Sequence, residues 1–254
     1  MITTHKTPKF KPHGQFSRGT PIENEILLPL EFLLLNLSPV YYGFGIPHGD
    51  GSAVVLIPGL IGLDESMLLM YWWLKRIGYR PYLSGVGLMA DCPQVLSKKL
   101  QLTIDKAFAE TGRRRVHLIG HSLGGIFARI AAVRRPKQIA SVISLGSPIR
   151  GMVAHELVFT IADWIRSLIH SRNPDLPETC GTTHCMCAFG RSLTRKWPRL
   201  VRQTAMFSRN DGLVDWHHCI TGQEDTDIEV QATHLGMLVD AGVYWQIAQR
   251  LARA

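Results

Sequence analysis

Short apolar runs alternate with amphipathic segments along the chain from residue 53 onward. The apolar runs predict buried strands at residues 53–57, 80–84, 116–120, 141–145, 205–208 and 228–231. Segments between and after the runs repeat apolar residues at helical spacing and predict helices at residues 64–77, 93–112, 124–133 and 235–251. Alternating strands and helices are typical of a mostly parallel sheet that is covered by helices on both faces. The pattern therefore predicts an α/β fold.

Two stretches interrupt this alternation. Residues 1–50 precede it and predict an N-terminal appendage to a main domain of residues 51–254. Residues 150–202 contain a helix candidate at 153–169 but no clear strand, so we expect a cap or lid inserted into that domain. Asp64, Pro93 and the glycines at 78 and 112 are the local signals that start or stop the first two helices.

The appendage holds an apolar segment at residues 26–37. It is too short to cross a bilayer, and Pro29, Glu31 and Asn36 interrupt it. We expect either a helix docked on the domain, which we favour, or an interfacial segment that touches lipid.

Candidate chemistry is concentrated in Gly120-His121-Ser122-Leu123-Gly124. This G-x-S-x-G sequence follows a predicted strand and opens a predicted helix, which is the setting of a nucleophile elbow. A serine on such a tight turn has a strained backbone, and the flanking glycines avoid collisions with neighbouring backbone. We predict that Ser122 is a nucleophile; a glycine-rich turn that binds an anion is the alternative.

A serine hydroxyl needs a general base, and the base needs a carboxylate that orients it. Asp211 and His234 each follow a late predicted strand. The order serine, acid, histidine is the one found in α/β folds that carry their nucleophile on such an elbow. Asp215 is the alternative acid, although it is better placed to start the next segment. His217 and His218 are alternative bases, but they precede the last strand.

The oxyanion of the reaction needs two backbone N–H donors. We expect one from Leu123, directly after the nucleophile, and one from the loop at residues 58–62 after the first strand. In that loop Leu60 is the favoured donor, unless the loop is an ordinary Pro-Gly turn. Gly59, which allows close approach, and His121 are predicted to border the substrate.

Together, these motifs resemble those of bacterial α/β-hydrolases of the lipase-like group, which is similar to triacylglycerol lipases and GPI-inositol deacylase-like hydrolases. The resemblance covers roughly residues 25–250. Its motifs are GHSLGG (residues 120–125), IPGLIG (57–62), SRNDGLVDW (208–216) and ATHLGM (232–237). It implies an α/β-hydrolase fold, a nucleophile at Ser122, an acid and base at Asp211 and His234, and oxyanion donors at Leu60 and Leu123. The common His-Gly opening of the oxyanion loop is replaced here by Pro58-Gly59.

Composition narrows the range of partners. The chain has 254 residues, a formal charge of +8 and a pI of about 9.4, so its surface favours anionic partners. Basic residues cluster at 6–18, 113–115, 134–137 and 191–202, but no nucleic-acid-binding motif lies beside them. A basic surface without a partner is favoured over weak association with an anionic membrane. We expect no nucleic-acid partner.

The five cysteines do not form a complete disulfide framework. Cys180, Cys185 and Cys187 cluster with His184, so incidental thiols, a local disulfide from Cys180 to Cys185 or Cys187, and a zinc site are the alternatives. The C-x4-C-x-C spacing is not a standard zinc pattern, and we expect no metal. We also expect no organic cofactor and, since no signal sequence is evident, a cytoplasmic protein.

These features predict a carboxylic ester hydrolase, an esterase or lipase that acts through an acyl-enzyme on a small-molecule or lipid ester. An acyltransferase with the same triad and a non-catalytic binding protein with the same fold are the alternatives.

Overall fold

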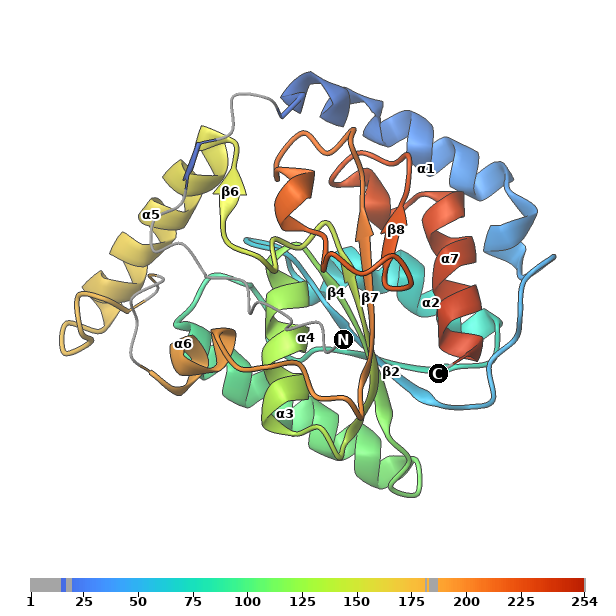
Figure 1. The fold of residues 1–254 in the computed structure, drawn as a ribbon, viewed down its shortest axis with the longest axis horizontal. Coiled ribbons are helices and arrows are strands. Elements are labelled where there is room, and N and C mark those ends of the chain that lie inside the picture. Colours follow the sequence, from blue (N-terminus) through green and yellow to red (C-terminus); the bar gives the residue numbers. More distant parts are fainter. Residues whose placement is uncertain (1–14, 17–19, 181, 183–186, 254) are drawn as a thin grey trace, which may run out of the picture.

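The computed structural model describes residues 15–16, 20–180, 182 and 187–253, and a parallel sheet lies at its centre (Figure 1). The order of its six strands is β3-β2-β4-β5-β7-β8, and every neighbouring pair is parallel. The strands are β2 (Ala53–Ile57), β3 (Arg80–Leu83), β4 (Val116–His121), β5 (Ile139–Leu145), β7 (Arg202–Phe207) and β8 (Asp227–Glu229). The predicted parallel sheet is confirmed, although β8 begins and ends earlier than predicted.

Helices cover both faces of this sheet. They are α2 (Leu68–Arg76), α3 (Pro93–Glu110), α4 (Leu123–Arg134) and α7 (Ala241–Ala252). Side chains alternate along a strand, so neighbouring residues of β2 enter different cores. Leu56 packs in the cluster of Trp73 and Tyr244, which come from α2 and α7. Val55 packs in the cluster of Phe127, from α4.

The predicted starts of the first and last helices are wrong. Asp64 does not cap the helix of α2: it lies inside the short 3-10 helix η3 (Asp64–Met67), and its carboxylate accepts hydrogen bonds from the loop that begins at Ser84. The last helix does not start at residue 235, because a 3-10 turn, η5 (Gly236–Leu238), intervenes. The Asp240 carboxylate then accepts the Val243 amide and starts α7.

The helix predicted at 153–169 in the cap region is α5 (Glu156–Arg172), which begins and ends three residues later, and α6 (Ala188–Leu193) follows it. The expectation that the cap region holds no strand is wrong, because β6 (Val153–Ala154) pairs in parallel with β1 (Gln15–Phe16). The same segment is joined to the loop after β7, since the His155 amide donates to the Leu213 carbonyl at 2.8 Å. The base of the predicted cap is therefore attached next to Asp211.

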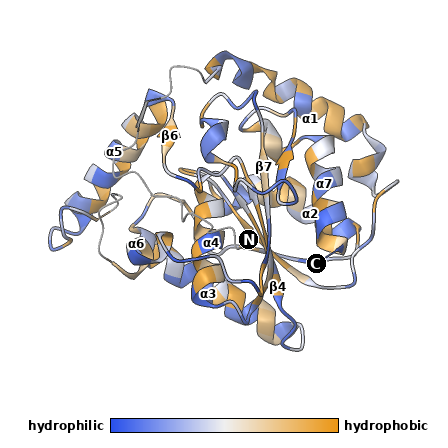
Figure 2. Ribbon diagram, viewed as in Figure 1, coloured by the Kyte–Doolittle hydropathy of each residue, from blue (hydrophilic) through white to orange (hydrophobic). Residues whose placement is uncertain are grey.

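The apolar N-terminal segment forms η1 (Ile22–Leu27), α1 (Leu28–Leu37) and η2 (Pro39–Tyr42) along the outside of the molecule (Figure 1). It is docked, since Leu35 is fully buried and the Trp73 indole N–H donates to the Val40 carbonyl at 3.0 Å. Figure 2 nevertheless shows hydrophobic residues along α1 on the outside. The exposed ones in η1 and α1 are Ile26, Leu27, Leu30, Phe32, Leu33, Leu34 and Leu37. No helix among the described residues is long and apolar enough to cross a membrane.

Candidate active site

Ser122 lies on a strained turn between β4 and α4, which we call the nucleophile turn (residues 120–125). Its φ is 51° and its ψ is −121°, a conformation that costs a residue with a side chain about 1–3 kcal/mol. A Cβ on Gly120 would collide with the backbone of Gly124 and Gly125, and one on Gly124 would collide with the backbone oxygens of Ile57 and Pro58 at the end of β2. The two glycines are thus needed because backbone segments approach each other closely, as the motif predicts.

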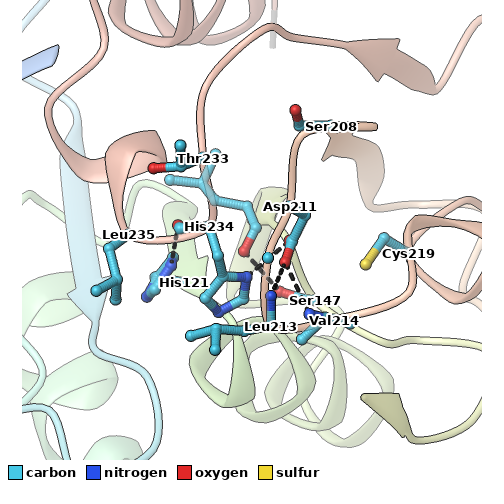
Figure 3. A network of polar contacts seen from close by, with 12 residues as sticks. His121, Ser147, Ser208, Asp211, Leu213, Val214, Cys219, Thr233, His234 and Leu235 are labelled. Carbon is cyan, nitrogen blue, oxygen red and sulfur yellow. Dashed lines mark hydrogen bonds and ion pairs between the residues drawn. The ribbon is translucent and has the colours of Figure 1, made fainter. Parts of the chain in front are cut away.

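Asp211 and His234 form a buried ion pair (Figure 3). The His234 Nδ1 lies 2.7 Å from Asp211 Oδ2, and each residue is only 3% exposed. The other carboxylate oxygen of Asp211 accepts the amides of Leu213 at 2.9 Å and Val214 at 2.7 Å. All of these contacts hold the carboxylate in one orientation toward the imidazole.

The charge around His234 favours its protonated form. Burial alone would lower the pKa of this imidazole, but the Asp211 charge, the hydrogen bond to Asp211 and the Glu25 charge together raise the pKa above its ordinary value. An imidazole that stabilises a proton in this way is suited to general-base chemistry.

His121 lies beside His234 rather than in the solvent. Its Nε2 is 2.9 Å from the His234 carbonyl oxygen, and the two ring centroids are 4.8 Å apart. Burial, followed by repulsion from His234, lowers the pKa of His121 to about 3. The ring is therefore neutral, and its Nε2–H donates to the carbonyl. His121 thus contacts both the backbone and the ring of His234. The contact of His121 with substrate stays a prediction.

The ion pair and the nucleophile turn meet at Gly146, the residue after β5. A Cβ placed there would lie 3.0 Å from His234 Nδ1 and 3.1 Å from Asp211 Oδ2. The preceding residue, Leu145, accepts the Ser122 amide at 2.8 Å. Thus Ser122, Asp211 and His234 lie at the carboxyl-end edge of the sheet, where active sites of parallel sheets occur. The contacts of the described residues do not include a Ser122–His234 hydrogen bond; such bonds often tighten only with substrate.

The loop after β2 packs against the nucleophile turn. A Cβ on Gly59 would lie 3.1 Å from the Ser122 Cβ, so this backbone passes directly beside the nucleophile. Within the described residues the Leu60 amide donates to no other group. Leu123 is the first residue of α4, and its N–H has no acceptor within the helix. Ile61 has a φ of 53°, and its amide donates to the Met89 carbonyl at 3.1 Å, which fixes the loop.

The alternative acid and base contact each other instead of the nucleophile turn. Asp215 accepts the His217 amide at 3.0 Å and its Nδ1 at 2.7 Å, and so starts the 3-10 turn η4 (Trp216–His218). This is the structural position that the sequence favours for Asp215.

Sequence reasoning missed two carboxylates of the N-terminal segment. Glu25 Oε1 accepts the amides of Gly212 at 3.0 Å and His234 at 2.8 Å, and its Oε2 accepts the Leu235 amide at 3.0 Å. Glu31 accepts the amide and hydroxyl of Thr233 at 2.7 and 2.8 Å. The available signal was a carboxylate directly before the apolar segment and another within it; from the sequence we interpret Glu31 only as an interruption and give Glu25 no role.

The cysteine prediction is tested only in part, because Cys185 and His184 lie outside the described residues. The Cys180 thiol lies 3.5 Å from the Cys92 thiol, a neighbour that the sequence did not indicate. The Cys187 sulfur accepts the Gly190 amide at the start of α6. Among the residues that the structure describes, no group of three or more His, Cys, Asp and Glu side chains is arranged to hold a metal ion.

The sequence and the fold of this chain are both similar to those of known proteins. A family model described as alpha/beta hydrolase fold matches residues 103–169. Triacylglycerol lipases of Pseudarthrobacter phenanthrenivorans and Burkholderia plantarii are each 34% identical over 134 residues, which is 50% of this chain and 40% and 36% of those proteins. A triacylglycerol lipase of Vibrio cholerae is 30% identical over 140 residues, 53% of this chain and 42% of that protein. The matches thus span about two fifths of these relatives.

Solved structures share the fold over most of the chain. A metagenomic carboxyl esterase has a TM-score of 0.58 at 16% identity and covers 94% of this chain and 92% of its own. A lipase of Bacillus licheniformis in mature form has a TM-score of 0.54 at 16% identity and covers 82% and 94%. The chain has the α/β-hydrolase fold, and over about half of its length its sequence is similar to bacterial triacylglycerol lipases.

Proposed function

We propose that this chain, with its α/β-hydrolase fold and lipase-like sequence, is a serine hydrolase that cleaves carboxylic esters. Ser122 is the nucleophile, His234 the general base and Asp211 the carboxylate that orients it. The Nδ1–H of His234 donates to Asp211, so its Nε2 is the atom that takes the proton from the serine hydroxyl. The oxygen of Ser122 bonds to the acyl carbon, and the alcohol leaves with the proton held by His234. Water, deprotonated by the same imidazole, then attacks the acyl carbon; the bond to the Ser122 oxygen breaks, this oxygen takes the proton back from His234, and the acid is released.

The observation that carries this proposal is the buried Asp211–His234 pair beside a serine on a strained turn. A buried carboxylate that raises the pKa of its imidazole stabilises the imidazolium that forms in each step. The amides of Leu60 and Leu123 support the proposal as donors to the oxyanion: among the described residues the Leu60 amide donates to no other group, and the Leu123 amide, at the start of α4, has no acceptor within the helix. The resulting chemistry uses no metal or organic cofactor.

The test is hydrolysis of p-nitrophenyl esters of increasing chain length, together with labelling by a fluorophosphonate probe. We expect wild type to turn over and to label, and Ser122→Ala to lose both, with activity falling at least about 10⁴-fold. Ser167→Ala, at an exposed serine of α5, is the matched control and should behave as wild type. An unlabelled wild type would support the non-catalytic alternative. Ester product formed from an added alcohol acceptor would support the acyltransferase.

For the substrate class, we propose lipid-like esters presented at an anionic lipid surface. Seven large apolar side chains of η1 and α1 are exposed; Ile26 is 81% and Leu37 72% exposed. They are next to the site, because Glu25 of the same segment contacts the His234 amide, and Leu235 is itself exposed. The formal charge of +8 complements anionic lipid headgroups.

Vesicle sedimentation tests this second proposal. Wild type should bind phosphatidylglycerol vesicles more strongly than phosphatidylcholine vesicles, and Leu33→Ser/Leu37→Ser should weaken that binding. The control is Leu102→Ser, at a 71% exposed leucine of α3. Equal binding by both variants would contradict a role for α1.

A further inference from the structure

The Glu25 carboxylate joins two loops that are far apart in sequence. Through Gly212 it holds the loop that bears Asp211, and through the amides of His234 and Leu235 it holds the loop that bears the base. Hydrogen bonds from amides to a charged carboxylate are about twice as strong as those between neutral groups. Three such bonds to one side chain therefore fix the relative position of the two loops.

The two loops lack side chains where the carboxylates approach. A Cβ on Gly212 would lie 2.9 Å from Glu25 Oε1 and equally close to the Ile22 Cα, so η1 packs directly on this glycine. A Cβ on Gly236 would collide with the Glu31 carboxylate. Both contact points thus fit carboxylates delivered by the N-terminal segment.

Three titratable groups contact His234. Asp211 accepts a hydrogen bond from one ring nitrogen of His234, and the neutral His121 ring packs beside the His234 ring. The Glu25 carboxylate accepts the His234 backbone amide. Glu31 contacts the adjacent Thr233. Glu25 is thus placed to act on His234 by its charge as well as by holding its backbone.

We propose that Glu25 is a positioning residue, whose carboxylate holds the Asp211 and His234 loops at catalytic spacing and keeps negative charge beside the base. This inference rests on the proposed function of the same site. It makes the Glu25 carboxylate, which lies in the predicted N-terminal appendage, a part of the active site, because the position of the base depends on it.

The experiment compares Glu25→Gln, Glu25→Asp, Glu31→Gln and Glu23→Gln, with folding checked by circular dichroism. In Glu25→Gln one acceptor becomes a donor, so at least one amide loses its partner. On the alkaline plateau, where His234 is neutral, we expect kcat to fall about 10-fold to 100-fold with little change in KM. Removing the negative charge should also move the acid limb of the kcat/KM profile to lower pH.

The companion variants separate position from charge. Glu25→Asp keeps the charge but shortens the reach, so kcat should fall while the acid limb stays in place; it also carries the kcat test if Glu25→Gln fails to fold. Glu31→Gln disturbs the same loop through Thr233 and should lower kcat without moving the acid limb. Glu23→Gln, at an exposed glutamate of η1, should match wild type.

An NMR titration of the His234 imidazole provides a readout that does not depend on activity. Its pKa should be lower in Glu25→Gln than in wild type and should not change in Glu23→Gln. Wild-type kcat and an unmoved acid limb in Glu25→Gln would overturn the inference and leave the proposed function intact. An inactive, unlabelled wild type would instead overturn the proposed function, and the titration would still decide whether the Glu25 charge acts on His234.

Discussion

The nucleophile turn and the base loop (residues 231–236) are neighbours in space but are held in different ways. The nucleophile turn is fixed by backbone that is close in sequence or in the adjacent strand: β4 leads in, α4 leads out, and Leu145 of β5 accepts the Ser122 amide. The base loop is neither helix nor strand until η5 begins. Its amides are held by side chains of Glu25 and Glu31, and the Glu25–His234 contact spans 209 residues.

This contrast teaches that one site can combine two kinds of constraint. The nucleophile turn depends on steric exclusion, because the backbone segments packed around it leave no space for a side chain at its glycines. A base loop depends on a few charge-assisted hydrogen bonds, each of which can be removed by one substitution. A substitution in the nucleophile turn should therefore lower the stability of the whole fold more than a substitution in the base loop.

The largest effect is expected for Gly120→Ala. The added methyl group would collide with the backbone of Gly124 and Gly125. Because neither β4 nor α4 can move away without losing its core packing, the free energy of unfolding should fall by about 3–5 kcal/mol. Urea denaturation followed by circular dichroism measures it.

The control for this substitution is Gly112→Ala, at a glycine with a φ of 66° and no neighbouring atom within 4 Å of the added Cβ. It should cost only about 1 kcal/mol of backbone strain. Equal losses in the two variants would mean that the backbone relaxes around the added methyl group, and that the collision at Gly120 does not set the cost.

The same contrast explains what the sequence predicts well. The glycines of the nucleophile turn are spaced by local geometry, so the motif predicts Ser122 with its strained backbone. Asp211 and His234 follow strands, so their chain order predicts them, and the structure brings them together in a buried pair. The alternation of strands and helices likewise predicts the sheet, because each element forms its pattern from nearby residues.

The rest could not be predicted, because it depends on contacts between distant residues. Nothing in ATHLGM indicates that Glu25 and Glu31 bind its amides. Helix α7 starts at Ala241, later than predicted, because Asp240 caps it; the residues before it form the 3-10 turn η5, whose first amide, at Gly236, donates to the Thr233 hydroxyl. Strand β6 contains only two residues, Val153 and Ala154, which are too few to show an alternating pattern.

A smaller effect is expected for Thr233→Val in the base loop. The Thr233 hydroxyl donates to Glu31 Oε2 at 2.8 Å and accepts the Gly236 amide at 3.0 Å, and the residue is buried. Valine has the same shape but leaves both partners unsatisfied, so the free energy of unfolding should fall by about 1–3 kcal/mol. Urea denaturation of Thr160→Val, which alters an exposed hydroxyl of α5, should show a change within about 0.5 kcal/mol. An unchanged free energy of unfolding in Thr233→Val would show that this hydroxyl does not hold the base loop.

The smallest effect concerns His121, which links the two regions, and appears as a change of stability with pH. Its pKa in the folded protein is about 3, below the ordinary value of 6.5, because burial and the neighbouring His234 disfavour its charged form. Between these two values the unfolded chain binds the proton and the folded protein does not. The stability from neutral His121 is therefore complete above about pH 6.5 and is lost as the pH falls toward 3. His117, whose pKa is lowered to about 4 chiefly by burial, acts in the same direction, and His234, whose pKa is raised, acts in the opposite one.

His121→Gln isolates the contribution of His121 to this slope. The glutamine amide can still donate to the His234 carbonyl but does not titrate, whereas His117 and His234 remain in both proteins. Between about pH 6 and pH 4.5, the free energy of unfolding of wild type should fall more steeply than that of the variant, by up to about 1.4 kcal/mol per pH unit for one proton. Urea denaturation at several pH values measures both slopes. Parallel slopes would mean that His121 binds its proton over the same pH range in the folded protein as in the unfolded chain, which would contradict the neutral ring that the burial of His121 predicts.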